Sequence, residues 1–256
     1  MLPISSRGLG SSHRYGAGDG HFPEYVRRLC DFQQMDFESA FDQVFCLLSI
    51  DPQKVYTSFY YRKQTKNQWA RDDPAFVVVE MIFVGVASLA YAVAFQNASF
   101  WGYLWALLYG LVVDWLLVGV AVASTFSYLA NKYLRQYHSH SVEQEVEWMF
   151  AFDVHANSFL CSFVLTHVLQ YFLLPILLNT GALPCLMSNI LYGLAVVWYA
   201  YITHLGYRTL PFLGNTQVFL WYPIVAVSFA LLFSIVLMMM GLRINMTRVI
   251  MAFHYG

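Results

Sequence analysis

The sequence predicts an all-α fold, a polytopic membrane helical bundle of five transmembrane helices preceded by N-terminal cytosolic amphipathic helices. Three observations support this prediction. Of the 256 residues, 59% are hydrophobic and only 11% are charged, whereas a soluble domain carries about 25% charged residues. Five long apolar runs follow residue 74, and most of the positive charge precedes them. A chain of this composition hides most of its surface in a bilayer.

The region before residue 74 divides into two parts by composition. Residues 1–35 are rich in Gly, Ser, Arg and His and poor in large apolar side chains, so we expect a disordered cytosolic tail. Residues 36–73 are expected to form a cytosolic helical segment. Apolar residues recur at helical spacing over 36–49, Pro52 ends or restarts that helix, and a basic helix is expected over 53–71.

The remaining residues, 74–256, are expected to form the transmembrane domain. Asp73 suits a helix N-cap and Pro74 suits a first helical turn, so the first span is expected to begin here. The five apolar runs reach or exceed the roughly 20 residues that a helix needs to cross a hydrocarbon core of about 30 Å. Their length and their lack of alternation exclude strands. The runs lie at about 76–95, 100–128, 155–178, 187–207 and 217–240.

The distribution of positive charge predicts the orientation of these spans. Nine Lys and Arg residues precede the first span, two follow the second span and one follows the fourth. Only two, in the C-terminal tail, fall on the other side of a five-span bundle. Because loops rich in Lys and Arg stay in the cytosol, we expect a cytosolic N-terminus and a lumenal C-terminus.

Ionisable side chains within the spans are few, and burying one costs several kcal/mol unless it is paired or hydrated. The candidates are Glu80, Asp114, His155, His167 and His204. Glu80 is expected near the cytosolic interface, where the helix dipole and snorkelling stabilise it. Asp114 lies near the middle of the second span. It either makes an interhelical hydrogen bond that fixes packing, which we favour, or forms a proton relay with His167.

The sequence contains no pattern typical of a catalytic, cofactor-binding or metal-binding site. His138, His140, Asp153 and His155 are close in sequence, but they lack the rigid spacing of metal ligands. Surface histidines and an N-cap aspartate explain them better. There is no nucleophile elbow, Walker loop or dinucleotide-binding loop. We therefore expect no enzymatic activity, no cofactor and no metal.

The basic and aromatic stretch over residues 54–71 is the most distinctive cytosolic feature. It suits a helix lying against a bilayer with anionic headgroups, where each Lys or Arg contributes about 1 kcal/mol. Alternatively, the same side chains could bind RNA phosphates or an acidic groove of a protein partner. The candidate partner or membrane surface consists of Arg62, Lys63, Lys66, Trp69 and Arg71.

Tyr61 to Phe76, YRKQTKNQWARDDPAF, resembles the signature of the Unc-fifty (uncoordinated-fifty) family. Stretches at 35–38, 131–134, 146–155 and 205–213 are similar to this family as well. The resemblance implies a five-span protein of the Golgi membrane, with the endoplasmic reticulum or nuclear envelope as further locations. It implies a role in early secretory traffic, including delivery of the nicotinic acetylcholine receptor as cargo. It also implies contact with a large Arf guanine-nucleotide exchange factor, and RNA binding has been attributed to a family member.

The leading hypothesis is therefore a trafficking adaptor. In this hypothesis the spans anchor the protein, and residues 36–71, together with the 129–154 loop, recruit the partner. The rival hypothesis is a small polytopic transporter or lipid-handling protein that uses Asp114 and His167. Transporters commonly contain internal inverted repeats, and five unequal spans do not divide in that way.

Overall fold

The computed structural model describes residues 25, 27–29, 31, 33, 35–95, 99–136 and 144–255. Most of the predicted disordered tail, together with His138 and His140, lies outside these residues. The described part of the chain is helical and contains no strand, so the predicted fold class is confirmed. Five of its helices are long and apolar enough to cross a membrane.

The first, fourth and fifth spans are single helices, and two further spans combine several helical segments. The single helices are α4 (Ala75–Ala94), α9 (Ala182–Arg208) and α10 (Val218–Met239). The second span, Phe100–Leu134, consists of α5 (Phe100–Leu108), η2 (Tyr109–Leu117), α6 (Val118–Leu129) and η3 (Ala130–Leu134). The third span, Trp148–Leu177, consists of α7 (Trp148–Phe163), η4 (Val164–Leu169) and α8 (Gln170–Leu177). The segments η2, η3 and η4 are π-helical turns within otherwise continuous helices.

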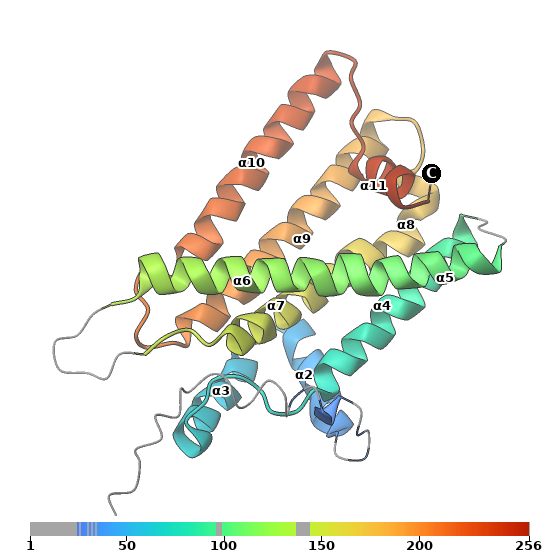
Figure 1. The fold of residues 1–256 in the computed structure, drawn as a ribbon. Coiled ribbons are helices and arrows are strands. Elements are labelled where there is room, and N and C mark those ends of the chain that lie inside the picture. Colours follow the sequence, from blue (N-terminus) through green and yellow to red (C-terminus); the bar gives the residue numbers. More distant parts are fainter. Residues whose placement is uncertain are drawn as a thin grey trace, which may run out of the picture.

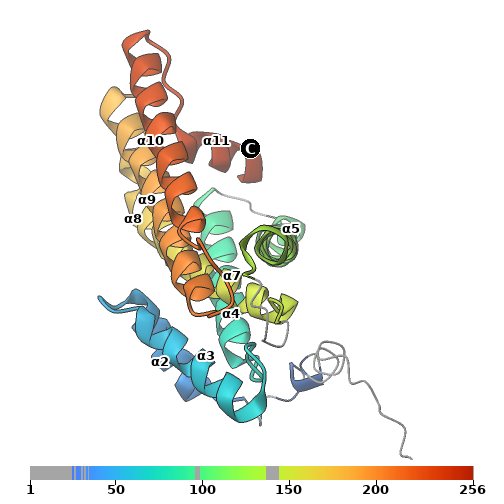
Figure 2. The ribbon, with the colours of Figure 1, turned by 90° about the vertical axis from the view of Figure 1, so that its left-hand side faces the viewer.

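The spans are arranged around α9, which packs along both α7 and α10. The second span crosses the others obliquely (Figures 1 and 2). Two short helices, α2 (Phe37–Leu48) and α3 (Gln53–Lys66), lie at one end of the bundle. A C-terminal helix, α11 (Met246–Tyr255), lies near the other end (Figure 1). The five candidate spans lie between α2–α3 and α11 in the sequence.

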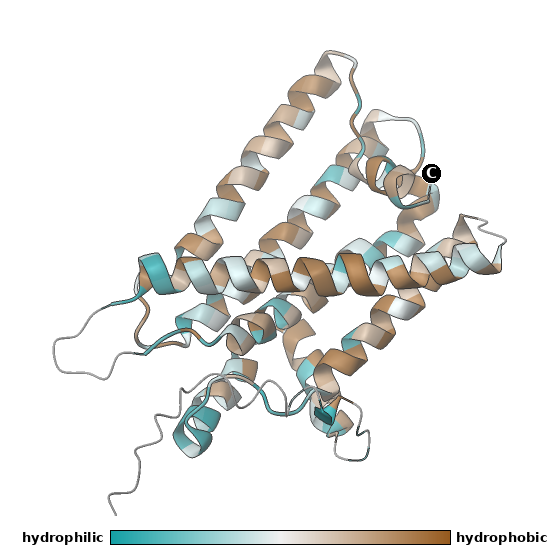
Figure 3. Cartoon of the chain, viewed as in Figure 1, coloured by the Kyte–Doolittle hydropathy of each residue, from teal (hydrophilic) through white to brown (hydrophobic). Residues whose placement is uncertain are grey.

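The surface of the spans is what a bilayer requires. Hydrophobic residues run along them, and hydrophilic residues gather around α3 and the segment that follows it (Figure 3). On α10, Phe229, Phe233 and Val236 remain largely exposed. No residue in the most apolar 18-residue stretch of this helix is buried within the protein. Such a helix is stable only where hydrocarbon replaces water as its solvent.

Several predicted helix limits are corrected by the structure. Pro52 does separate two helices, but the second helix ends at Lys66 instead of residue 71. Asn67 adopts a left-handed conformation with φ 55°, and its N–H bonds to Lys63 O, which closes the helix. The third span begins at Trp148, seven residues before the predicted start, because its first two turns are buried by protein.

The start of α4 lies close to the predicted position. Asp73 Oδ1 accepts a hydrogen bond from the Ala75 amide at 2.9 Å, and Pro74 occupies the cap position. Asp73 Oδ2 also accepts from the Asp36 amide at 2.9 Å, directly before α2. One carboxylate therefore fixes the start of the first span and the start of α2 together.

Candidate functional site

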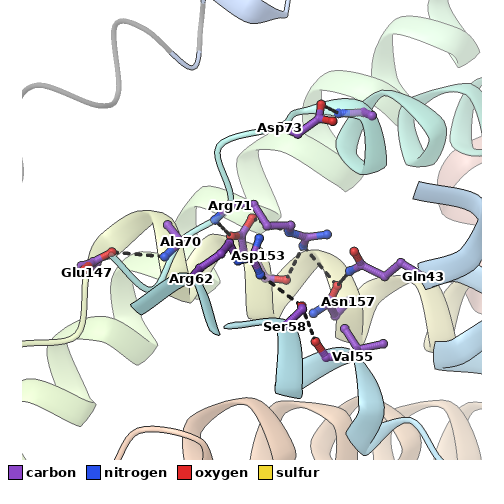
Figure 4. A network of polar contacts seen from close by, with 11 residues as sticks. Gln43, Val55, Ser58, Arg62, Ala70, Arg71, Asp73, Glu147, Asp153 and Asn157 are labelled. Atoms are coloured by element: carbon purple, nitrogen blue, oxygen red, sulfur yellow. Dashed lines mark hydrogen bonds and ion pairs between the residues drawn. The ribbon is translucent and has the colours of Figure 1, made fainter. Parts of the chain in front are cut away.

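A buried arginine lies where the extramembrane helices meet the bundle (Figure 4). Arg71 belongs to the strap, residues 67–74, which joins α3 to α4. Its Nε lies 3.2 Å from Asp153 Oδ1 on α7, and its backbone amide donates to Asp153 Oδ2 at 2.7 Å. Its Nη2 donates to Asp153 O and to Asn157 Oδ1, at 3.2 and 3.1 Å. The strap is thereby bound to the third span through main chain and side chain.

The environment of Arg71 explains how a charge can be buried here. The Arg71 and Asp153 side chains are only 7% and 1% exposed, so each desolvated charge requires the other. The guanidinium carbon of Arg71 also lies 4.5 Å from the ring centroid of Phe76 and 5.7 Å from that of Phe59. These aromatic faces add a favourable cation–π contribution.

Two further contacts extend this junction to neighbouring elements. Glu147, just before α7, accepts hydrogen bonds from the amides of Trp69 and Ala70 at 3.1–3.2 Å. Gln43 of α2 donates to Asn157 Oδ1 at 2.6 Å. We call Gln43, Arg71, Glu147, Asp153 and Asn157 the arginine junction. It joins α2, the strap and the third span in one network.

An aromatic core supports the junction from the side of α3 and α9. Phe59 packs edge-on against Phe150, with ring centroids 5.6 Å apart, and Trp69 contacts the same ring at 6.3 Å. The Tyr56 hydroxyl donates to Ile202 O at 3.0 Å. Burial raises the pKa of the Tyr56 hydroxyl, so this group remains a hydrogen-bond donor. The helix α3 is therefore fixed on the bundle by packing as well as by the strap.

The predicted partner surface is divided by the fold. Trp69 and Arg71 are buried, so the expectation that their side chains are exposed to a partner or to RNA phosphates is wrong. Arg62 lies 4.2 Å from the Phe59 ring centroid, and desolvation lowers the pKa of its guanidinium to about 10. Lys63 donates to Asn67 O at 3.0 Å, and Lys66 pairs with Asp72 near the surface. Only the lysines and part of Arg62 remain accessible.

The interpretation of Asp153 and His155 as surface groups is also wrong. Because α7 already begins at Trp148, Asp153 lies within the helix and faces Arg71 rather than capping a helix start. His155 is 5% exposed, and its Nδ1 lies 2.7 Å from the Tyr199 hydroxyl. Among the residues that the structure describes, no cluster of His, Cys, Asp or Glu could hold a metal.

Glu80 does not snorkel to the interface as expected. Its side chain is 1% exposed and turned into the bundle, where Trp115 Nε1 donates to Oε2 at 3.4 Å. This bond joins the first span to the second. His204 has a similar packing role, because its Nδ1 lies 3.0 Å from Thr216 O before the fifth span.

Asp114 and His167 line the same cavity, but they do not bond to each other as the alternative proton-relay hypothesis requires. Asp114 Oδ2 lies 3.1 Å from His254 Nε2 on α11, and His167 Nδ1 lies 3.0 Å from Thr166 Oγ1. Asp114, His167 and His254 line one cavity of about 100 Å³ near the end of the bundle that carries α11. No pattern in the sequence pointed to His254, because this residue lies outside the spans.

The fold and the arginine junction define a five-span α-helical membrane protein whose extramembrane helices are fixed to the bundle by a buried ion pair. The chain belongs to the UNC-50 family, whose sequence model matches residues 25–255. It is 42% identical to "Protein unc-50 homolog" of Dictyostelium discoideum, over all of this chain and 99% of the relative. It is 41% identical to "Protein unc-50 homolog" of Homo sapiens, over 82% of this chain and 79% of the relative. It is also 41% identical to "Protein unc-50" of Caenorhabditis elegans, over 87% and 71%. No solved structure matches the chain.

Proposed function

We propose that this protein is a membrane-anchored adaptor of early secretory traffic in the Golgi. In this proposal α2, α3 and the strap form a cytosolic platform that recruits a large Arf guanine-nucleotide exchange factor. Cell-surface delivery of the nicotinic acetylcholine receptor is one outcome of that traffic. The arginine junction carries the proposal, because it holds a small helical platform in one position on the bundle. A recruitment surface requires such a fixed position.

The charge and exposure of α3 indicate what kind of partner it suits. The exposed side of the helix carries Tyr60 and Tyr61, 49% and 62% exposed, beside Lys63 and Lys66. Tyrosine is enriched where proteins bind one another, and lysine steers acidic partners. Twelve of the 14 Lys and Arg residues fall on this side of a five-span bundle, which supports a cytosolic platform.

Proximity labelling of the full-length protein, with the labelling enzyme on its N-terminus, tests the proposal in cells. We expect the exchange factor among the labelled neighbours of the unmodified chain. Lys63→Glu and Lys66→Glu should each reduce its labelling by about tenfold, since reversing an interfacial charge opposes association. Lys54→Glu, on the same helix but next to Asp51, is the matched control and should leave the labelling unchanged.

Two outcomes would contradict the proposal. If the unmodified chain does not label the exchange factor, the platform does not recruit it. If the Lys63 and Lys66 variants reach the same membrane and keep the same neighbours, another surface is responsible.

A further inference from the structure

An apolar groove separates the first span from the third. Its volume is about 480 Å³, and α4 forms one wall while α7, η4 and α8 form the other. Val44 and Leu48 of α2 also contribute to its lining. At the rim, Ile82, Val86 and Phe172 are more than half exposed. Because these residues belong to membrane-spanning helices, the groove opens sideways toward hydrocarbon.

The groove adjoins the small polar cavity of Asp114 and His254. Tyr91 and His167 line both spaces. Their rings are nearly perpendicular, with centroids 6.2 Å apart, and the Tyr91 hydroxyl donates to His167 O at 3.0 Å. The two spaces together are apolar along most of their length and polar at one end. This is the usual composition of a small-molecule site, in which a few polar groups orient an apolar ligand.

The hydrogen bonds of His167 define what its free ring nitrogen can bind. Thr166 donates its single hydroxyl proton to Ser162 O at 3.0 Å. The same oxygen lies 3.0 Å from His167 Nδ1, so in the neutral ring Nδ1 carries the proton and donates to Thr166. Nε2 is then an acceptor, and it bonds to no residue in the described ranges. The complementary ligand group is a donor such as a hydroxyl.

We propose that this groove is a binding site for an uncharged lipid that carries a hydroxyl group. Its hydrocarbon body lies between α4 and α7–α8, and its hydroxyl donates to His167 Nε2 at the boundary with the polar cavity. Asp114 and His167 both lie on π-helical turns, η2 and η4, which interrupt regular helices frequently at functional sites. Asp114 and His167 are also ionisable residues of membrane-spanning helices that line a cavity, and such residues commonly mark a functional site.

The lining argues against a phosphate headgroup. Among the described residues that line either space there is no Lys or Arg, and Asp114 would repel an anion. The occupant is therefore a sterol, a diacylglycerol or a ceramide rather than a phospholipid. Each of these presents a hydroxyl donor on an apolar body.

Photoaffinity labelling of the full chain in nanodiscs tests this proposal. The probes are a photoactivatable sterol, diacylglycerol and ceramide, each with a matched analogue in which the hydroxyl is methylated, and a photoactivatable phosphatidylcholine. We expect at least one hydroxylated probe to label residues 82–91 or 160–172 about fivefold more than its methylated analogue, the effect of one hydrogen bond. The probe that succeeds identifies the lipid class. Equal labelling by phosphatidylcholine, or by every methylated analogue, would overturn the proposal.

Variants separate the groove from a general effect on folding. Ala90→Trp fills the groove and should abolish labelling, whereas Leu89→Trp, on the same helix but outside the lining, should not. His167→Phe keeps an aromatic ring against Phe163, whose centroid lies 4.7 Å away, but removes the acceptor. It should retain labelling and lose the preference for the hydroxyl. If Ala90→Trp does not fold, the test is whether unlabelled lipid of the same class reduces probe labelling of the unmodified chain. Labelling that unlabelled lipid does not reduce would reject the site.

Discussion

Arg71 is bonded to Asp153 through its main chain as well as its charge, because its amide donates to Oδ2 at 2.7 Å while its Nε lies 3.2 Å from Oδ1. The aspartate thus determines where the strap runs and where the guanidinium lies. A change at Asp153 would release both, although the residue is 82 positions away in the sequence.

Asp153→Ala is expected to destabilise the protein by about 3–5 kcal/mol, because it leaves Arg71 charged and buried without a partner. Thermal unfolding of the detergent-purified protein measures this effect. The exposed pair of Lys54 and Asp51 is the control, and Asp51→Ala should change stability by no more than about 0.5 kcal/mol. Replacing Arg71 and Asp153 together by Leu should cost less than the single change. A double variant less stable than Asp153→Ala would contradict this account.

Glu147→Ala should loosen the strap without unfolding the spans. The carboxylate accepts the amides of Trp69 and Ala70, and a buried donor left without a partner costs about 1–3 kcal/mol. Limited trypsin digestion should cleave the variant faster after Lys66 and Arg71. Glu145→Ala is the control, since that carboxylate is 71% exposed and pairs with Arg135. Equal cleavage of both variants would show that Glu147 does not hold the strap.

Gly206 marks a close approach of α9 to α7. A Cβ atom at this position would lie 2.7 Å from Val154 Cγ2 and 3.2 Å from Tyr56 Cε1. Gly206→Ala should therefore lower stability by about 1–3 kcal/mol through overpacking. At Gly85 a Cβ would meet only a Leu107 methyl group, at 3.3 Å, so Gly85→Ala should have a smaller effect in the same unfolding assay. The reverse order would mean that α9 can move away from α7.

The contact of His254 with Asp114 should make the docking of α11 depend on pH. The hydrogen bond that His254 donates to the Asp114 carboxylate raises the pKa of His254 above its ordinary value of 6.5. A raised pKa in the folded state contributes stability that is complete below 6.5 and is lost as the pH rises through the raised value. Hydrogen exchange of residues 246–255, corrected for its intrinsic rate, should therefore be slower at about pH 5.5 than at about pH 8.5.

Asp114→Asn provides the control for this pH dependence. The amide keeps the size of the side chain but removes the charge that favours protonated His254, so the difference between the two pH values should shrink. Tyr255, His167 and Tyr109 also face this region, and none of them is changed in the variant. A pH dependence as large in Asp114→Asn as in the unmodified chain would exclude this contact as its origin.

Much of the fold could be predicted from the periodicity and length of the apolar runs. The five spans, the helix break at Pro52 and the start of the first span follow from local patterns that need no partner. The predicted start of the third span was wrong, because Asp153, His155 and Asn157 interrupt the apolar run that begins at Trp148, and only the folded structure shows that Asp153 pairs with Arg71 of the strap. The buried position of Arg71 was missed for a related reason, since a charged residue is normally exposed.

The sequence by itself determined that this chain is a membrane protein and which family it resembles. Composition and a sixteen-residue run can both be read without knowing which residues pack together. Only the tertiary structure decided which charges are buried, which helix Asp114 contacts and where a lipid-sized groove opens. Those properties depend on residues distant in the sequence, such as Arg71 with Asp153 and Asp114 with His254. A polar side chain within or beside an apolar helix indicates that a hydrogen-bonding or charged partner is required. Only the packing of the spans identifies that partner.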